Sequence, residues 1–232
     1  MVKTTGIHHI AIMSADIKSQ IEFFSDVLGC ELSALFDMHG VPGGLHAFMH
    51  LSDDCYFSIV QLPAAAEIPA EIGVTHAGTG AGPCAPGTLQ HLAFKVDSPE
   101  RLRAIRDRIR KKGVNVIGPI DHGMCQSIYF GGPENLVLEV STSEAAINAE
   151  AWIDPEVVEM NGISAEELKQ FKNPAAYTNE SGAPVEQPPA GNGMPEYTHM
   201  DAEFAAAFDL PDEVVTREMS ENTPPVQIAS AG

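Results

Sequence analysis

Three side chains that bind metal ions well, His9, His91 and Glu139, each stand in a short apolar run of the sequence. Two neutral imidazoles and one carboxylate form the recurring ligand set of non-haem Fe(II), and they leave coordination positions open for substrate and oxygen. The same set accepts Mn(II), Zn or Ni, so the metal is not fixed by the residue types alone. Burial of Glu139 within the run 136–140 would be costly without a cation. The sequence therefore predicts one mononuclear metal site made by these three residues.

The two histidines open the two copies of an internal repeat. Each copy begins with a strand pattern, at 9–12 and at 91–96, in which side chains alternate between two faces. A helical pattern follows at 16–28 in the first copy and at 99–112 in the second. The repeat therefore places the two imidazoles at equivalent positions, which is the main reason for treating them as a pair.

Capping residues mark where both predicted helices begin and end. Asp16 is a suitable N-cap for the first, and Ser98 followed by Pro99 is a stronger start signal for the second. Gly29 and Gly113 follow the two patterns, and glycine supplies the left-handed conformation that commonly ends a helix.

Short strand-like runs follow each helix. They lie at 30–36, 45–51 and 56–62 in the first copy, and at 114–117, 126–130 and 136–141 in the second. Each copy therefore reads strand, helix, strand, strand, strand. We expect an α+β domain over residues 1–143, built from paired βαβββ modules at about 6–64 and 88–142. The stretch 73–87, rich in Gly, Pro and Thr, is expected to be the loop that joins them.

Residues 144–232 form a strongly acidic extension. They carry 17 of the 32 acidic side chains but only 3 of the 13 basic ones, within a formal charge of −19. Nucleic acids and anionic membranes need clustered Lys and Arg, so neither is an expected partner. Helical pieces are predicted at 144–152, 164–171 and 201–208, with an extended stretch at 173–195. We expect a partly helical arm that packs on the core or mediates a homo-oligomer; a disordered tail is the alternative.

The remaining composition suggests a reduced compartment. The four cysteines are scattered without a CxxC pair, which favours free thiols. No basic segment followed by a long apolar run opens the sequence, and no run approaches the length of a membrane span. A cytoplasmic protein is the resulting expectation.

The sequence resembles the vicinal oxygen chelate superfamily, which includes glyoxalases, bleomycin- and fosfomycin-resistance proteins and extradiol dioxygenases. The resemblance covers residues 6–142 and rests on the motifs Ile7–Ile12, Leu89–Phe94 and Tyr129–Glu139. It implies paired βαβββ modules whose curved sheets form a metal-binding cup. By position, His9, His91 and Glu139 match the family's metal ligands.

The stretch from Ile120 to Glu139 is similar to the signature of type I extradiol ring-cleaving dioxygenases. Its match implies that His122 and Tyr129 lie beside a metal-bound catechol, where His122 could exchange a proton with a substrate hydroxyl near neutral pH. Gly132 and Asn135 depart from the signature. The family's distal histidine aligns with Tyr56, and either His46 or His50 is an alternative. The resemblance thus implies a dioxygenase that takes O2 and a small catecholic or vicinal-oxygen substrate in aromatic degradation.

Two alternatives remain open. A glyoxalase-like lyase, isomerase or epimerase usually takes a fourth protein ligand from the first module, where the run 56–61 offers only Gln61. A metal-free small-molecule binder of the resistance type generally lacks the ligand set that this chain retains.

Overall fold

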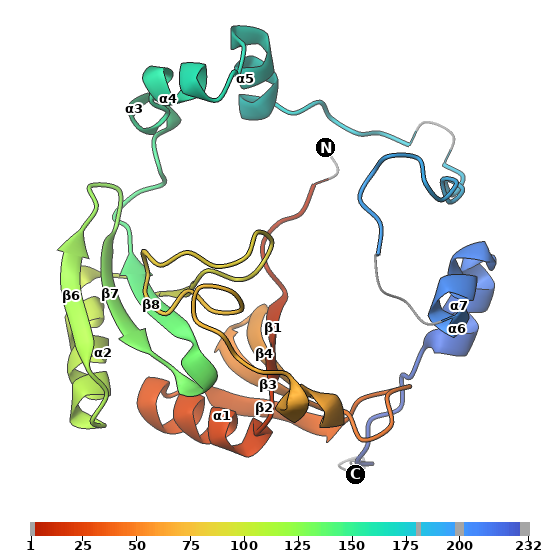
Figure 1. The fold of residues 1–232 in the computed structure, drawn as a ribbon, viewed down its shortest axis with the longest axis horizontal. Helices are drawn as coiled ribbons and strands as arrows, with labels where there is room; N and C mark the ends of the chain where they lie inside the picture. Colours follow the sequence, from red (N-terminus) through yellow and green to blue (C-terminus); the bar gives the residue numbers. More distant parts are fainter. Residues whose placement is uncertain (1–2, 180–181, 198–201, 228–232) are drawn as a thin grey trace, which may run out of the picture. The chain divides into compact units, whose positions relative to one another are not determined.

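The computed structural model describes residues 3–179, 182–197 and 202–227. The chain divides into two compact units (Figure 1). One unit, Thr5–Asn173, holds both predicted modules and the first part of the extension. The other contains Pro174–Gly232 together with Met1–Thr4.

The first module is a four-stranded sheet in the order β1-β4-β3-β2. Its strands are β1 (His9–Ser14), β2 (Glu31–Asp37), β3 (Leu45–Ser52) and β4 (Cys55–Gln61). β1 pairs with β4 in parallel, whereas β4, β3 and β2 are antiparallel neighbours. The parallel pair requires a crossover, which the helix after β1 supplies.

The second module repeats this topology in the order β5-β8-β7-β6. Its strands are β5 (Leu92–Lys95), β6 (Val116–Asp121), β7 (Gln126–Gly131) and β8 (Val137–Thr142). β6 is an edge strand whose register with β7 shifts between Ile117 and Ile120, where Pro119 interrupts it. The paired βαβββ prediction is therefore confirmed, although β6 begins later than expected.

The predicted helix caps are present in both modules. α1 (Ile17–Phe23) begins after Asp16, whose carboxylate accepts the Ser19 N–H, and it continues as a π-helical turn, η1 (Phe24–Leu28), up to Gly29. α2 (Pro99–Lys111) begins after Ser98, whose hydroxyl accepts the Arg101 N–H. Gly29 and Gly113 have positive φ angles of 83° and 85°, as a left-handed helix end requires.

The two modules share one hydrophobic core. Phe24 of η1 lies 4.3 Å from Phe57 of β4 and 6.1 Å from Phe94 of β5, measured between ring centroids. The apolar side chains of both sheets on this side belong to a single cluster. A polar link accompanies it: Glu134, in the 3-10 turn η3 (Pro133–Asn135), accepts the Ala15 N–H at 2.7 Å and the buried Gln20 amide at 2.6 Å. One face of each sheet is therefore turned toward the other module.

The connecting segment between the modules is irregular, as predicted. It contains one 3-10 turn, η2 (Pro63–Glu67), and an isolated bridge between Ile72 and His76. Its remaining residues up to Gln90 are turns and loop.

The extension is helical in short pieces. Thr5–Asn173 includes α3 (Ala149–Trp152), α4 (Pro155–Met160) and α5 (Ala165–Lys172). Ser164 and Glu167 form a capping box at the start of α5. The helix expected over 144–152 is shorter, because the Asn148 side chain caps it by accepting the Glu150 N–H.

The second unit holds α6 (Ala202–Ala206), the turn η4 (Ala207–Asp209) and α7 (Asp212–Met219). The predicted helix start at Asp201 lies outside the described residues, and α4 and α7 were not predicted. Within this unit Tyr197, Phe204 and Phe208 contact one another through their rings. The described part of 173–195 has neither helix nor strand, as expected.

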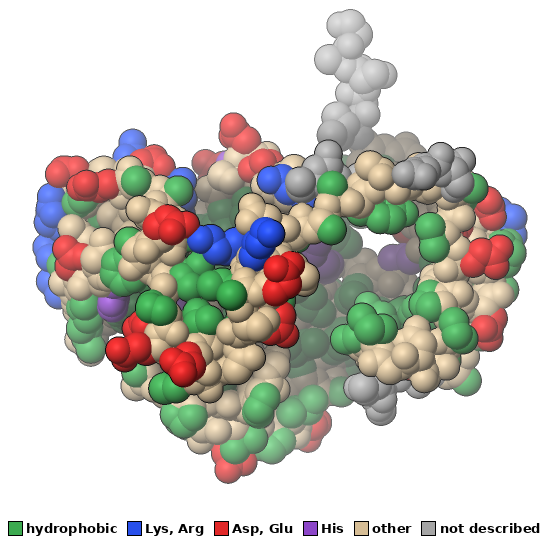
Figure 2. Space-filling model, turned by 90° about the horizontal axis from the view of Figure 1, so that it is seen from above, with side chains coloured by type: hydrophobic (Ala, Val, Ile, Leu, Met, Phe, Trp, Pro, Cys, Tyr) green, Lys and Arg blue, Asp and Glu red, His purple; other side chains and the backbone are tan. Residues whose placement is uncertain are grey.

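On the face in view, Asp and Glu side chains are scattered among exposed hydrophobic ones (Figure 2). Among the described residues, no helix has the length and apolar character needed to cross a bilayer. All four cysteines are free and half-buried.

Candidate metal centre

His91 and Glu139 meet at the start of the second sheet. His91 directly precedes β5, and Glu139 lies in β8, where it pairs with Ala93 of β5 and Tyr129 of β7. The His91 Nε2 atom is 2.9 Å from the Glu139 Oε2 atom. Donor atoms that bind one ion at about 2.0–2.2 Å and at right angles lie about 3 Å apart. The separation of this pair therefore fits two ligands of one ion.

Gln90 determines which nitrogen of His91 carries a proton. Its amide nitrogen donates to the carbonyls of Thr79 at 3.1 Å and Gly82 at 2.9 Å, so its amide oxygen faces His91 Nδ1 in close contact. An amide oxygen only accepts hydrogen bonds, so Nδ1 must be the donor. In a neutral ring, Nε2 then presents its lone pair to the Glu139 carboxylate. Two acceptors at this distance need a proton or a cation between them.

Hydroxyl groups hold the Glu139 carboxylate from its other side. Glu139 is only 5% exposed. Its Oε1 atom accepts a close hydrogen bond from the Ser141 hydroxyl, which in turn lies 2.8 Å from the Ser127 hydroxyl. With Oε1 held by Ser141, Oε2 is left to face His91. Partners of this kind orient metal ligands in many proteins. The chemistry and geometry of the pair therefore fit a divalent ion.

His122 and Tyr129 lie next to this pair. The Tyr129 hydroxyl is 3.1 Å from His122 Nε2, and the Tyr129 ring is 6.3 Å from the His91 ring between centroids. Burial, and then the negative charge of Glu139, raise the pKa of Tyr129 above its ordinary value. Tyr129 therefore keeps its proton at neutral pH. The linker packs on this residue too, because a side chain at Gly80 would come within 3.2 Å of its ring.

His9 is placed on the other sheet, at the first position of β1. Its Nδ1 atom is 2.9 Å from His8 Nδ1, and its ring is 5.4 Å from Phe48. Pairing in the sheet sets His9 beside Tyr56, which is opposite His50. These side chains share one face of the first sheet.

His46 belongs to the same face. Its Nε2 atom is 2.5 Å from the Ser58 hydroxyl, and its ring is 4.4 Å from Phe48. Burial, and then the nearby charge of His9, lower the pKa of His46, so that its ring stays neutral at neutral pH. Phe36 stacks on Phe48 at 6.2 Å with nearly parallel rings. Tyr56, His46 and His50, the three candidates for the distal position, thus surround an aromatic patch near His9.

His9 is not brought to His91 and Glu139 within the chain. The shared core lies against one face of each sheet. His9 is on the other face of the first sheet, and Glu139 is on the other face of the second sheet. Within the described ranges, no group of three or more His, Cys, Asp or Glu side chains could hold a metal ion. One chain therefore presents the predicted ligands as a pair and a separate histidine.

Gln61, the possible fourth ligand, has a structural role in this fold. Its side-chain oxygen accepts the Ile17 N–H at 2.7 Å and so caps the start of α1.

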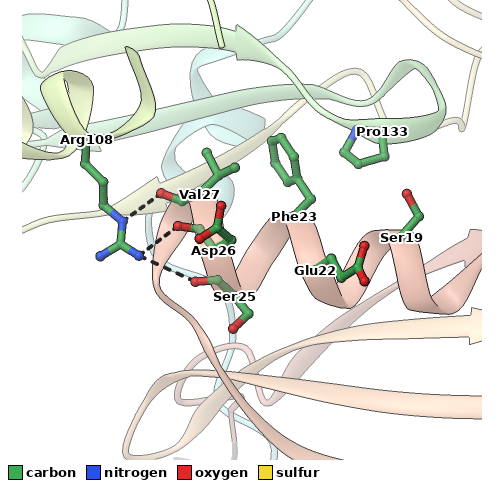
Figure 3. A pocket seen from close by; sticks show the side chains of 8 residues that line it. All are labelled: Ser19, Glu22, Phe23, Ser25, Asp26, Val27, Arg108 and Pro133. Atoms are coloured by element: carbon green, nitrogen blue, oxygen red, sulfur yellow. Dashed lines mark hydrogen bonds between the residues drawn. The ribbon is translucent and has the colours of Figure 1, made fainter. Parts of the chain in front are cut away.

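A cavity of about 630 Å3 lies elsewhere, between η1 and α2 (Figure 3). There the Arg108 guanidinium donates to the carbonyls of Val27 at 2.8 Å and Asp26 at 2.9 Å, at the end of the π-helical turn. A cation placed at a helix C-terminus satisfies free carbonyls. None of the candidate metal ligands lines this cavity, and Arg108 joins the modules.

Two supporting residues, Gln90 and Ser141, were not identified from the sequence. Gln90 acts through carbonyls of the linker, and Ser141 acts through the pairing of β7 with β8. No local sequence motif predicts these contacts.

Comparisons with solved structures find similar chains. A glyoxalase family protein from Enterococcus faecalis is 23% identical, over 59% of this chain and 97% of its own, with a TM-score of 0.44. The fosfomycin resistance protein FosX from Listeria monocytogenes, complexed with Mn(II) and sulfate, is 18% identical over 61% and 94%, with a TM-score of 0.40. TnmS3, an antibiotic binding protein from Streptomyces sp. CB03234, is 19% identical over 62% and 99%, with a TM-score of 0.44.

No curated protein matches the sequence. The family model of the Glyoxalase/Bleomycin resistance protein/Dioxygenase superfamily matches residues 6–140, which are more than half of the chain. This match and the twofold βαβββ topology agree with the resemblance seen in the motifs. The chain belongs to the Glyoxalase/Bleomycin resistance protein/Dioxygenase superfamily.

Proposed function

We propose that this protein is a metal-dependent enzyme that binds one divalent ion, Fe(II) first among the possible ions, through His91, Glu139 and His9. The observation that carries the proposal is the His91–Glu139 pair, in which Gln90 directs a lone pair of His91 at a buried carboxylate. When bound, such an ion lowers the pKa of substrate oxygens that chelate it and offers positions for oxygen chemistry.

The reaction that we propose is extradiol-type ring cleavage of a small catecholic or other vicinal-oxygen substrate. His122 and Tyr129 support it because their side chains are within hydrogen-bond distance of each other and Tyr129 adjoins His91. Tyr129, protonated at neutral pH, donates a hydrogen bond to a substrate oxygen. His122 accepts or returns the substrate proton as the general acid–base group.

We propose that His9 reaches the site from a second copy of the chain. The ligand faces of both sheets are turned away from the shared core, so each can be covered by the other module of a partner. Met13 on the first sheet and Ile117 on the second are 51% and 68% exposed on these faces, and such a partner would bury them. A symmetric pair would then contain two complete sites.

Metal content and oxygen-dependent turnover test the function together. The wild-type protein, loaded anaerobically with Fe(II), should retain about one ion per chain and turn over catechols under air but not under argon. Glu139→Gln keeps the shape of the side chain but removes the charge, so it should lose both the ion and the turnover. His39→Ala, at an exposed turn, is the matched control and should retain both. Full metal retention by Glu139→Gln would contradict the site.

The aromatic patch on the first sheet favours a second candidate, metal-free binding of a flat aromatic molecule. Phe36, Phe48 and Tyr56 would supply its stacking surface. Micromolar binding of an aromatic ligand by wild-type protein that retains no ion, lost in Phe48→Ala, would favour this function over the enzyme.

A further inference from the structure

The single tryptophan of the chain packs on the turn that carries His122. Trp152 is the last residue of α3, which lies beyond residues 6–140 of the family match. A Cβ atom built on Gly123 would be 2.8 Å from Trp152 Cη2 and 2.9 Å from Cζ2. Gly123 also has a φ of 81°, which other residues rarely adopt. The indole ring therefore takes the space that only a glycine leaves open.

The turn under this ring is well defined. The Gly123 N–H donates to Asp121 Oδ1 at 2.7 Å, and the His122 N–H donates to the Cys125 carbonyl at 2.9 Å. From this turn the His122 side chain extends to the Tyr129 hydroxyl. A displacement of the turn would therefore move His122 relative to Tyr129.

Helix α3, which carries Trp152, is held by contacts of its own. Lys172 of α5 forms an ion pair with Glu150 of α3 at 2.6 Å, and Asn148 caps α3. The ring also lines a cavity of about 360 Å3, between the β6–β7 turn and the start of the extension, with Met124 and Cys125. In Figure 1, α3 follows β8 on the same side as the β6–β7 turn. The extension is thus connected to the β6–β7 turn, which carries His122, through the ring of Trp152.

We propose that Trp152 is a positioning residue, which holds the β6–β7 turn so that His122 stays against Tyr129. The effect on catalysis rests on the proposed function, whereas the anchoring of the turn does not. The extension then determines the geometry of the site without contacting the substrate.

Hydrogen exchange tests the anchoring in the full-length protein without any substrate. In Trp152→Ala, the peptide over Asp121–Gln126 should exchange at least about threefold faster, because local opening of the turn becomes easier. Trp152→Phe should restore most of the protection. Met160→Ala, which removes an 82% exposed side chain from the same extension, should leave the exchange unchanged. Unchanged exchange in Trp152→Ala would overturn the proposal, whatever the enzyme assays show.

Gly123→Ala approaches the same contact from the other side. Trp152 is 47% exposed in the wild type. The methyl group should push its ring further into water, and the emission of this sole tryptophan should shift to the red. An unshifted emission would also overturn the contact.

A double-mutant cycle tests the effect on catalysis. His122→Phe should lower kcat about a hundredfold, and Trp152→Ala about tenfold, with metal content unchanged. If Trp152 acts only through His122, adding Trp152→Ala to His122→Phe should cause little further loss. Additive losses would overturn the positioning role. Wild-type protein without metal or turnover would refute the proposed function instead, and exchange and fluorescence would still decide whether the ring anchors the turn.

Discussion

At the scale of single residues, the sequence identifies the metal-binding types but not what orients them. His91 and Glu139 follow from the repeat and from a carboxylate in an apolar strand, and the structure places them 2.9 Å apart. Gln90 has no such signal, because its effect on the His91 ring depends on the carbonyls of Thr79 and Gly82. Contacts made by irregular backbone are not encoded in any periodic pattern.

Gln90→Leu should weaken metal binding about 10- to 100-fold while leaving the fold intact, because the His91 ring loses the acceptor that fixes its tautomer. Equilibrium dialysis against Fe(II) or Mn(II) measures the change. Gln170→Leu removes an exposed amide from α5 and should bind the ion as the wild type does. Equal affinities of the two variants would show that Gln90 does not orient the ring.

At the scale of elements, capping residues were the most informative signals. Asp16, Ser98 and the two terminal glycines mark the helices within a residue or so of their observed ends. The π-helical turn at the end of α1 was not predictable, because it is stabilised by Arg108 from the other module. Helix propensities depend on residues nearby in the sequence, so they do not predict a contact with a residue as distant in sequence as Arg108.

The η3 turn supplies a pH-dependent link between elements. Burial raises the pKa of Glu134, but hydrogen bonds from Gln20, Ala15 and Ser14 outweigh it and hold the pKa below its usual value of 4.5. A lowered folded-state pKa stabilises the protein fully above about pH 4.5, and this contribution is lost as the pH falls through the folded value. Because Glu134 is largely exposed, the charge itself contributes modestly.

Glu134→Ala should cost about 1–3 kcal/mol at pH 7, chiefly because it leaves the buried amide of Gln20 unpaired. Urea unfolding at several pH values measures this. The difference from wild type should shrink modestly below pH 4, because protonation removes the charge of Glu134 but leaves an oxygen that can still accept the Gln20 hydrogen bond. Glu159→Gln on α4 is a suitable control. A difference that persists unchanged at pH 3 would argue against a contribution from the charge of Glu134.

The shared core of the two modules has a consequence for unfolding. Phe24 is fully buried and contacts aromatic rings from both sheets. Phe24→Ala should therefore cost about 3–5 kcal/mol. Both modules should lose structure in one transition, which hydrogen exchange of β4 and β8 can follow. Loss of protection in the first module alone would show that the modules unfold separately.

At the scale of the whole molecule, the paired βαβββ architecture could be predicted, but the direction in which each sheet faces could not. Alternation distinguishes two faces of a strand, such as Phe57 from Ser58, without saying which module covers which face. The sequence therefore suggested three ligands in one cup, and the structure separates His9 from the other two. The domain boundary after residue 143 remains a prediction, while the first compact unit continues to Asn173.

Mixed assemblies test whether a second copy completes the site. His9→Ala and Glu139→Ala should each bind little metal alone. Co-expressed in equal amounts, they should recover about a quarter of the wild-type metal content, since half of random pairs contain one intact site. A mixture of His91→Ala and Glu139→Ala, both altered in the second module, should recover none. Equal recovery in the two mixtures would rule out the exchange.

Pro119 interrupts β6 at the free border of the second sheet, and the register shifts beside it. Proline has no backbone N–H, so a strand of another molecule that paired with this edge would lack one backbone hydrogen bond. This border of the second sheet therefore resists pairing with strands of other molecules and stacking into fibres.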